Sequence, residues 1–453
     1  MAKTLGMDLT TGSIFKKMVK FSVPLIFTYW LQLAFNFADI IVLGAMVGDN
    51  AVAAVGSTSS LINLIIGLFT GLSFGANIMI SKYLGENNQE KVRRTVGLSI
   101  IVSVVFGVVL LIIGQIFART FLVWMNSPSE LIDMSTLYLK VYFLGMPIRL
   151  LYNFCASILR ASGETVKPMI FLLVGGVLNV GLNVFFISVV SLTVDGVAIA
   201  TVMSELVSGI LCIVVLIKND GTVKLCKKYL RFYKEEFIEM IKQGVPSGIQ
   251  GCLFSFSNVI IQSGINSFGE ITVAGNSYAS QIESFVYYAM YAFSVGIMSF
   301  VGQNYGVRNF KNVKKSIAYG VCLSCTVGIV LSNTCWILSQ TFLSLLSGDP
   351  EVISVGMIRM DYICRFYFLC AIMEGLSFGL KGLGKSTTAM LITLFGTCVL
   401  RVLWVKIALN IYNSVSVIYV AYLITWVLTA IGHLIALMVL FKKIKKKLNK
   451  EEI

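Results

Sequence analysis

The sequence predicts an all-α polytopic membrane protein, with twelve transmembrane helices in two six-helix lobes that are related by a parallel pseudo-twofold repeat. The first observation is composition: of 453 residues, 57% are hydrophobic and only 13% are charged, against roughly 25% charged residues in soluble proteins. The second is that the apolar residues form long runs, and the third is that the second half of the chain repeats the first. Together they exclude a soluble enzyme, a secreted disulfide-stabilised domain and a disordered tail.

Twelve apolar runs reach the length of about 20 residues that a membrane helix requires. In chain order they cover residues 19–43, 57–81, 95–118, 135–159, 169–190, 196–217, 243–268, 277–301, 316–339, 355–380, 389–410 and 415–441. Each must be helical, because the hydrocarbon of a bilayer cannot satisfy open backbone groups. The ten cysteines lie mostly inside these runs, so we expect neither a disulfide framework nor a metal centre built on them.

Nearly all basic residues fall in alternate loops and at the two ends of the chain. This group begins with Lys3 and Lys16, includes the stretch 218–242 and ends with the tail after Phe441, whereas the opposite loops carry only Arg119 among several acids. Membrane proteins retain Lys and Arg on the cytoplasmic side, so we expect both termini in the cytoplasm. The net charge of +14 then faces the anionic inner leaflet, and we expect no nucleic-acid partner.

A nearly constant offset relates the two halves of the chain: Gly75 falls on Gly296, and Pro24 falls on Pro246. The predicted domains are an N-lobe of residues 1–218, a cytoplasmic linker of residues 219–242 and a C-lobe of residues 243–453 with a basic cytoplasmic tail. Because each lobe has an even number of spans, the lobes share one orientation, as in transporters built from parallel repeats. A transporter with a cleft between the lobes is favoured over a channel for this reason.

The first span carries a polar stripe, formed by Thr28, Gln32, Asn36 and Asp39. Their spacing places them on one helical face, which we expect to line a substrate cavity rather than to face lipid. Pro24 lies near the inner end of the span, where it predicts a bend in the helix.

The seventh span repeats the stripe with Gln250, Ser255, Asn258 and Gln262, but the position that matches Asp39 is Ile260 or Ile261. We expect Asn258 and Gln262 to line the substrate cavity as well. An acid in only one of two repeats suggests that one half is specialised for a cation.

Asn179 and Asn183 are one helical turn apart in the fifth span, and Thr201 lies at the start of the sixth. A carboxylate together with amide and hydroxyl oxygens is what a hard monovalent cation requires, so these residues and Asp39 form a candidate cation site. Ordinary hydrogen bonding between helices is the alternative for the two asparagines.

Several other ionisable residues also fall inside spans, where each is a functional candidate by default. Arg359, Asp361 and Arg365 are interpreted as a buried structural pair in the tenth span. Basic groups such as Arg149 or Arg401 are candidate partners for Glu205 and Glu374, but the sequence leaves the partners of Glu205, Glu283, Asp361 and Glu374 open.

Two short segments match sequence motifs of soluble enzymes but lack the structural context that those motifs require. Residues 379–386, GLKGLGKS, match a P-loop, but a membrane span precedes them where a P-loop requires a strand. GLSFG at 71–75 and 375–379 matches the elbow of a serine hydrolase, again without a strand, and also matches the helix-packing motif G-x-x-x-G. We therefore predict a tight turn and close helix packing, and we expect no enzyme activity.

The chain resembles the multidrug and toxic compound extrusion (MATE) family over nearly its whole length. The matching segments are Pro24 through Asp39 to Ala53–Ala54–Val55–Gly56, GLSFGANIMISKYLG, LRASGETVKPM, the Asn179 and Asn183 pair, GVAIAT at 196–201 and VGQNYG at 301–306. The resemblance implies antiport, in which H⁺ or Na⁺ enters as an amphipathic and often cationic compound leaves, with no cofactor besides the coupling ion.

The resemblance also implies that the cation is coupled at Asp39, Asn179, Asn183 and Thr201. Family members of this type have a second carboxylate where this chain has Asn183. Another branch uses a glutamate of the seventh helix, and no acid occurs here between Ser247 and Phe268. The expected cycle takes up the ion at Asp39, bends the first helix near Pro24 and weakens drug binding.

The expected molecule is a monomer in the cell membrane whose partners are small substrates and lipid. A lipid-linked oligosaccharide flippase of the same superfamily is the nearest alternative, because Arg149, Arg365 and Arg401 could serve an anionic substrate. A membrane-embedded enzyme is the alternative of a different class, and the single histidine counts against it.

Overall fold

The computed structural model describes residues 6–451, without the side chains of Lys447, Leu448, Lys450 and Glu451. Lys3 and the side chains of Lys447 and Lys450, which belong to the basic regions expected in the cytoplasm, lie outside the described residues.

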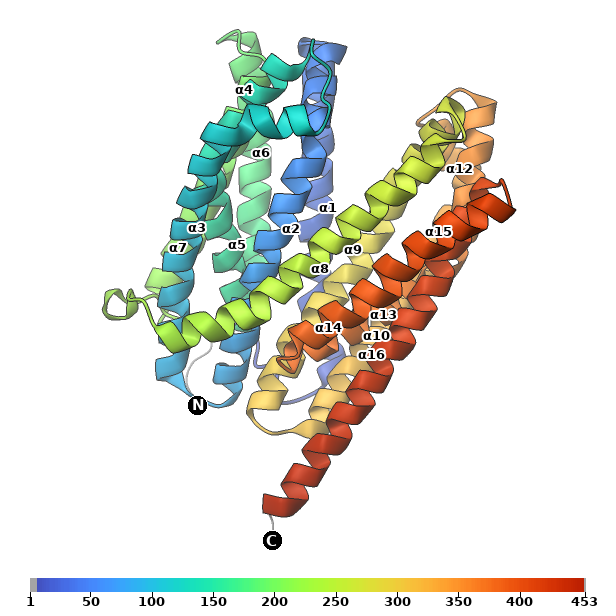
Figure 1. The fold of residues 1–453 in the computed structure, drawn as a ribbon. Helices are drawn as coiled ribbons and strands as arrows, with labels where there is room; N and C mark the ends of the chain where they lie inside the picture. Colours follow the sequence, from blue (N-terminus) through green and yellow to red (C-terminus); the bar gives the residue numbers. More distant parts are fainter. Residues whose placement is uncertain (1–5, 452–453) are drawn as a thin grey trace. The chain divides into compact units, whose positions relative to one another are not determined.

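The described residues are almost entirely helical, and no strand occurs between residues 6 and 451 (Figure 1). The helices are α1 (Ile14–Met46), α2 (Asp49–Gly85), α3 (Gln89–Trp124), α4 (Ile132–Leu144), α5 (Met146–Ala161), α6 (Val166–Ser188), α7 (Val194–Lys218), η1 (Lys227–Tyr229), α8 (Lys234–Asn266), α9 (Glu270–Gly306), α10 (Phe310–Ile337), α11 (Ser339–Ser344), α12 (Pro350–Ile363), η2 (Cys364–Phe366), α13 (Phe368–Gly382), α14 (Ser386–Thr393), η3 (Leu394–Val399), α15 (Leu400–Ile411) and α16 (Val415–Glu451).

Ten of these helices, with α14, η3 and α15 taken as one, are long and apolar enough to cross a membrane, and two bent pairs bring the number to twelve if each is one span. The prediction of an all-α, twelve-span protein is confirmed. The fourth span bends by 48° between α4 and α5, because Pro147 in the first turn of α5 has no N–H to continue the helical hydrogen bonds. The tenth span bends by 51° after the short turn η2.

The chain forms two compact units, and two of the three boundaries between them fall inside a helix. Unit 1 contains residues 6–8 and 27–248, and unit 2 contains residues 9–26 and 249–451. Helices α1 and α8 each contribute one part to each unit, and each boundary inside a helix follows shortly after a proline, Pro24 in α1 and Pro246 in α8. A proline removes a backbone hydrogen bond from a helix, so each helix is weakest close to the place where its two parts separate.

Unit 1 is packed through glycines that let its helices approach closely. A Cβ on Gly114 of α3 would meet the ring of Phe143, and one on Gly107 would meet the backbone of Pro147. Gly71 and Gly75, from the first GLSFG motif, lie in the same way against the backbone of residues 240–248 in α8. Small residues at such contacts are typical of membrane helices, and the helix-packing interpretation of this motif is confirmed.

Unit 2 is built around α9, whose apolar window is the most enclosed of the candidate spans. Phe300 of α9 packs edge to face on Phe21 of α1, with ring centroids 5.6 Å apart. The P-loop-like residues form a helix–turn–helix instead of a strand–loop–helix: α13 ends at Gly382, Gly384 has a φ of 69°, and α14 begins at Ser386. The tight turn predicted there is confirmed.

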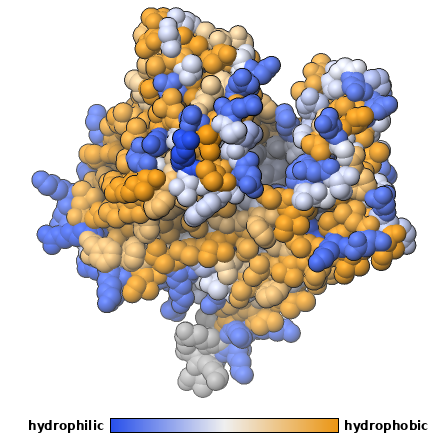
Figure 2. All heavy atoms as spheres, turned by 45° about the horizontal axis from the view of Figure 1, so that its top comes forward, coloured by the Kyte–Doolittle hydropathy of each residue, from blue (hydrophilic) through white to orange (hydrophobic). Residues whose placement is uncertain are grey.

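Large hydrophobic side chains remain exposed along most of the long helices, among them Ile41, Ile116, Val177 and Val330. Figure 2 shows hydrophobic residues over much of the face that it presents, with hydrophilic residues gathered in separate patches. Soluble monomers rarely expose apolar surface on this scale, whereas a bilayer requires it.

Candidate functional site

Four polar side chains meet inside unit 1, and they are the four that the sequence nominates for the cation. Asn183 donates a hydrogen bond from Nδ2 to Asp39 Oδ1 at 2.5 Å and another to Asn179 Oδ1 at 3.5 Å. Asn179 in turn donates to Thr201 Oγ1 at 3.3 Å, and the Thr201 hydroxyl donates to the carbonyl of Val197 at 2.9 Å. We call Asp39, Asn179, Asn183 and Thr201 the Asp39 cluster.

Small residues on α6 bring the three helices of the Asp39 cluster together. A Cβ on Gly176 would meet the ring of Phe35 on α1, and a Cβ on Gly175 would meet Ser204 and Ser208 on α7. Ser208 also donates a hydrogen bond to the carbonyl of Phe171 at 2.9 Å. Close packing of α1 and α7 on α6 therefore places Asp39 and Thr201 beside the asparagines further along α6.

Asn183 holds an oxygen that no described group satisfies. Its side chain is 0% exposed, and its Oδ1 atom has no hydrogen-bond partner among residues 6–451. Buried polar atoms almost always have a partner, so an orphan of this kind calls for an explanation. An amide oxygen with free lone pairs, next to a carboxylate, is a ligand for a hard cation.

The composition of the cluster matters for the kind of cation. Between residues 6 and 451 no group of three or more His, Cys, Asp and Glu side chains gathers at one place. A cation at the Asp39 cluster would therefore rely on amide and hydroxyl oxygens beside one carboxylate. This donor set fits Na⁺, and the carboxylate alone can hold a proton.

An ion pair lies beside the Asp39 cluster. Arg149 of α5 donates two hydrogen bonds to Glu205 of α7, one of them from Nε to Oε2 at 3.0 Å. The Arg149 guanidinium also lies over the ring of Tyr142, 4.4 Å from its centroid. Arg149, one of the candidate partners of Glu205, is the one that pairs with it. The closeness of this pair to Asp39 cannot be predicted from spacing, because the three residues come from three separate helices.

The rest of the polar stripe on α1 varies in burial. Thr28 is fully buried, Gln32 is partly buried and Asn36 is exposed. Pro24 belongs to the part of α1 in unit 2, whereas the stripe itself belongs to unit 1.

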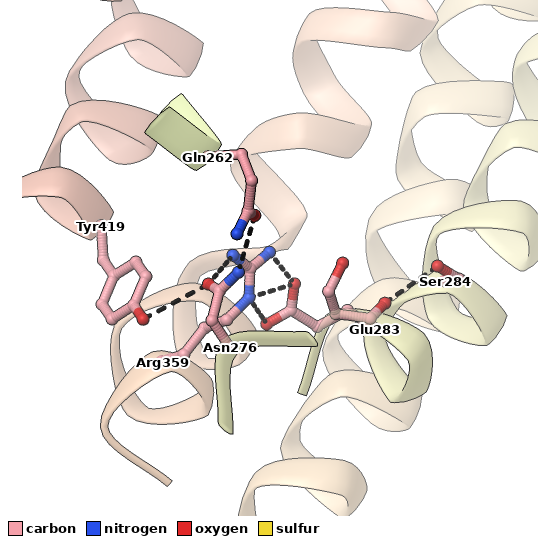
Figure 3. A network of polar contacts seen from close by, with 7 residues as sticks. Gln262, Asn276, Glu283, Ser284, Arg359 and Tyr419 are labelled. Atoms are coloured by element: carbon pink, nitrogen blue, oxygen red, sulfur yellow. Dashed lines mark hydrogen bonds and ion pairs between the residues drawn. The ribbon is translucent and has the colours of Figure 1, made fainter. Parts of the chain in front are cut away.

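Unit 2 places an ion pair in its own polar network (Figure 3). Arg359 donates to Glu283 from Nε at 3.0 Å and from Nη2 at 2.6 Å, and it donates to Asn276 Oδ1 from Nη1 at 2.7 Å. Asn276 donates to Gln262 Oε1 at 3.2 Å, and Tyr419 donates to Asn276 Oδ1 at 3.3 Å. Gln262 of the second stripe is therefore engaged in this network.

The rest of the second stripe is divided between the surface and the interior. Asn258 is exposed, and Ile261, at the position that matches Asp39, is buried. Gln250 donates to Ser377 and Thr393 inside unit 2.

The predicted pairing in the tenth span is wrong in one respect. Arg359 forms a buried ion pair as expected, but its partner is Glu283 of α9 and not Asp361. Asp361 bonds instead to Arg365 at 3.2 Å and to the indole N–H of Trp336 at 3.0 Å. The Asp361 and Arg365 side chains are 47% and 46% exposed, so this second pair is not buried.

Arg401 and Glu374 are both buried, and no ion pair joins them within the described part of the chain. Arg401 donates to Thr425 Oγ1 at 3.0 Å and lies over the ring of Tyr422, 4.2 Å from its centroid. The suggested pairing of Glu374 with Arg401 is therefore not found.

Comparison with known proteins gives one family. The MatE family model matches residues 24–185 and 246–405, which is most of both halves of the chain. The "Probable multidrug resistance protein YoeA" of Bacillus subtilis is 29% identical over 76% of each chain. The "Multidrug export protein MepA" of Staphylococcus saprophyticus is 21% identical over 87% of each chain.

A solved structure shares the fold. It is described as the outward-facing conformation of a multidrug resistance MATE family transporter of the MOP superfamily, with a TM-score of 0.92 and 22% identity over 98% of this chain and 100% of the other.

Proposed function

Because this chain belongs to the MATE family, we propose that it is a secondary active multidrug exporter, which exchanges H⁺ or Na⁺ for amphipathic and often cationic compounds. The relatives named as multidrug resistance or export proteins support the substrate class. The Asp39 cluster supports the exchange, and the observation that carries it is the buried, unsatisfied oxygen of Asn183 beside the Asp39 carboxylate.

Each residue of the Asp39 cluster has its own role in the proposed exchange. Asp39 supplies the negative charge that holds either ion, and Asn183 and Thr201 offer neutral oxygens that a proton does not need and Na⁺ does. Asn179 ties α6 to α7 through its hydrogen bond to Thr201. A change of ion at Asp39 therefore alters the hydrogen bonds that connect α1, α6 and α7.

Antiport requires that the ion and the drug favour different states of the protein, or use the same charge in turn. Uptake of the ion at Asp39 removes the charge that attracts a cationic substrate. Pro24 provides the place where α1 can bend as the two parts of that helix change state. Thr28, Gln32, Asn36, Asn258 and Gln262 are the proposed substrate contacts.

The protein sits in the cell membrane as a multi-pass monomer, with both termini in the cytoplasm. The orientation is supported by the concentration of basic residues in alternate loops and in the tail after Phe441.

A lipid-linked oligosaccharide flippase is the second candidate, and Arg401 is the observation that favours it. Of the three arginines proposed for an anionic substrate, Arg149 is neutralised by Glu205 and Arg365 by Asp361. Arg401 is the one whose hydrogen bonds go to a neutral hydroxyl. Loss of surface polysaccharide on deletion of the gene, without drug sensitivity, would favour this function.

Ethidium efflux from a pump-deficient host tests the proposed export. We expect the wild-type chain to lower the cellular ethidium level and Asp39→Asn to fail at equal expression. Asp361→Asn is the matched control, because it removes an acid from a half-exposed ion pair of unit 2. Equal export by wild type and Asp39→Asn would contradict the coupling role.

A further inference from the structure

The Asp39 cluster has one carboxylate, that of Asp39, beside amide and hydroxyl groups. Position 183 holds an amide, Asn183, whose Nδ2 serves Asp39 and Asn179 while its oxygen stays free. Within the cluster, Asp39 is therefore the source of negative charge.

Glu205 places a second carboxylate on the side of α7 that carries Thr201. It follows Thr201 by one helical turn, so the two side chains lie on one face of that helix. Its carboxylate accepts both hydrogen bonds that Arg149 donates from α5. The second acid therefore reaches the neighbourhood of the cluster from α7 and has its own counter-charge.

The pair is close enough to influence Asp39 by charge. Arg149 and Glu205 both lie within electrostatic range of the Asp39 carboxylate, and they act on it with opposite signs. Tyr138 of α4 lies within range of all three groups. The ring of Tyr142, over which Arg149 lies, is 6.0 Å from the ring of Tyr138. The ion pair and the Asp39 cluster therefore form one electrostatic neighbourhood.

The comparison with unit 2 separates this pair from a purely structural one. The Arg359 and Glu283 side chains are 8% and 4% exposed, and Asn276 takes a further hydrogen bond from Arg359. The Arg149 and Glu205 side chains are 17% and 23% exposed. The pair of unit 1 is thus the more accessible one, and its members can change partners at a lower desolvation cost.

Resting on the proposed cation exchange, we propose that Glu205 is a second acidic member of the cation site, contributed by α7, and that Arg149 is a tethered cation that neutralises it. Because the charges of Arg149 and Glu205 cancel, the net charge of the site equals that of Asp39 alone. One monovalent cation neutralises such a site completely, whereas a site with two free carboxylates favours a second charge. Arg149 and Glu205 are therefore specificity-determining residues for a single H⁺ or Na⁺.

Two single variants shift the charge of the site in opposite directions. Arg149→Gln leaves Glu205 free, so the half-saturating concentration of the driving ion falls by about tenfold. Glu205→Gln leaves Arg149 free to pair with Asp39, so that concentration rises by about tenfold. The double variant restores the original net charge and returns the concentration to within about threefold of the wild type. Arg149→Lys keeps the charge and stays near the wild-type value.

The test uses the purified full chain in proteoliposomes, with ethidium as the transported probe and with sodium and pH gradients imposed separately. The matched control is the double variant Asp361→Asn with Arg365→Gln, which removes a half-exposed ion pair of unit 2 and leaves half-saturation unchanged. Opposite shifts in the single variants and recovery in the double variant support the proposal. Unshifted folded single variants, or a folded double variant as impaired as the worse single variant, would overturn it.

The same assay distinguishes a failure of the proposed cation exchange from a failure of the proposed role of the Arg149–Glu205 ion pair. If neither gradient drives the wild type, or if Asp39→Asn is driven like the wild type, the proposed exchange itself is wrong. If Asp39→Asn loses coupling while the Arg149 and Glu205 variants keep wild-type half-saturation, only the role of the ion pair is wrong. If one single variant does not fold, a tenfold shift of the other single variant in its expected direction, with recovery in the folded double variant, supports the proposal. Wild-type half-saturation in that remaining single variant would overturn it.

Discussion

Asn183 is the residue that determines what the Asp39 cluster can hold. As an amide it donates to Asp39 and to Asn179, and it keeps one buried oxygen without a partner among the described residues. An aspartate at this position could not donate to Asp39 and would add a charge. The chain therefore combines one acid with a neutral oxygen, which suits a monovalent cation.

Replacement of Asn183 by aspartate tests this assignment. We expect Asn183→Asp to lower the half-saturating concentration of the driving ion by about tenfold, because a second negative charge is added next to Asp39. Asn183→Leu removes both the donor and the orphan oxygen, and we expect it to lose ion-driven transport. The measurement is ethidium transport against ion concentration in proteoliposomes, and unchanged half-saturation in Asn183→Asp would contradict the assignment.

Glu283 supports the fold of unit 2. Glu283→Gln leaves the buried Arg359 guanidinium without its counter-charge, so we expect the free energy of unfolding to fall by about 3–5 kcal/mol. Asp361→Asn, which breaks a half-exposed pair, should lower it by less. Thermal unfolding of the two variants in detergent measures the difference, and equal midpoints would contradict a structural role for Glu283.

The sequence identifies the members of the Asp39 cluster but not the partners of most other charged residues. Asn179 and Asn183 share a face of the fifth span, Asp39 belongs to a polar face of the first span, and both faces can be recognised from spacing alone. The partner of Arg359 could not be found in this way, since Glu283 comes from another helix. The spacing within the tenth span already argues against an ion pair between Arg359 and Asp361, because residues two apart on a helix do not face each other.

Among the elements, α1 and α8 stand out because each is divided between the two units. The division follows Pro24 in one helix and Pro246 in the other. Because both prolines remove a backbone hydrogen bond at equivalent places of the repeat, the two helices are the elements most suited to bend. The Asp39 cluster is attached to α1 and has no acidic counterpart on α8.

Loss of Pro24, the proposed bending point of α1, should slow transport without unfolding the protein. Pro24→Ala restores the missing backbone N–H and favours a straighter α1, so we expect the rate of ion-driven ethidium transport to fall severalfold at an unchanged thermal midpoint. Pro246→Ala is the matched control in α8, and we expect a smaller fall in the transport rate there. An undiminished rate in Pro24→Ala would contradict the role of this bend.

Close packing of α3 against α4 depends on Gly114. In Gly114→Ala the new Cβ would meet the ring of Phe143, so we expect a loss of about 1–3 kcal/mol in the free energy of unfolding. Gly56→Ala is the matched control, because a Cβ there meets nothing within 4 Å. Thermal midpoints in detergent compare the two, and equal midpoints would contradict the packing argument.

Hydropathy predicts the spans themselves but not their ends or breaks. The second apolar run, residues 57–81, is shorter than the helix that contains it, Asp49–Gly85. Hydropathy detects the apolar part of a helix and not the more polar residues at its ends. The break between α4 and α5 has a local signal in Gly145 and Pro147. The π-helical segment η3 has none, since its geometry depends on packing such as that of Gly396 against Thr429.

At the scale of the whole molecule, the two halves repeat a fold and differ in charge. Unit 1 holds the Asp39 cluster beside an accessible ion pair, and unit 2 holds the enclosed network of Arg359, Glu283 and Asn276. The sequence already indicates this difference, because Ile260 or Ile261 stands where Asp39 would fall. This asymmetry is the reason why we propose an exchangeable cation in unit 1 and none in unit 2.

Transport of ethidium by the reconstituted wild-type chain and Asp39→Asn, under a sodium gradient and a pH gradient imposed in turn, tests the central claim most directly. We predict that one of the gradients drives uphill movement of ethidium by the wild type and that neither gradient does so with Asp39→Asn. Uphill movement by Asp39→Asn at the wild-type rate would contradict the claim that this carboxylate couples the ion to the drug.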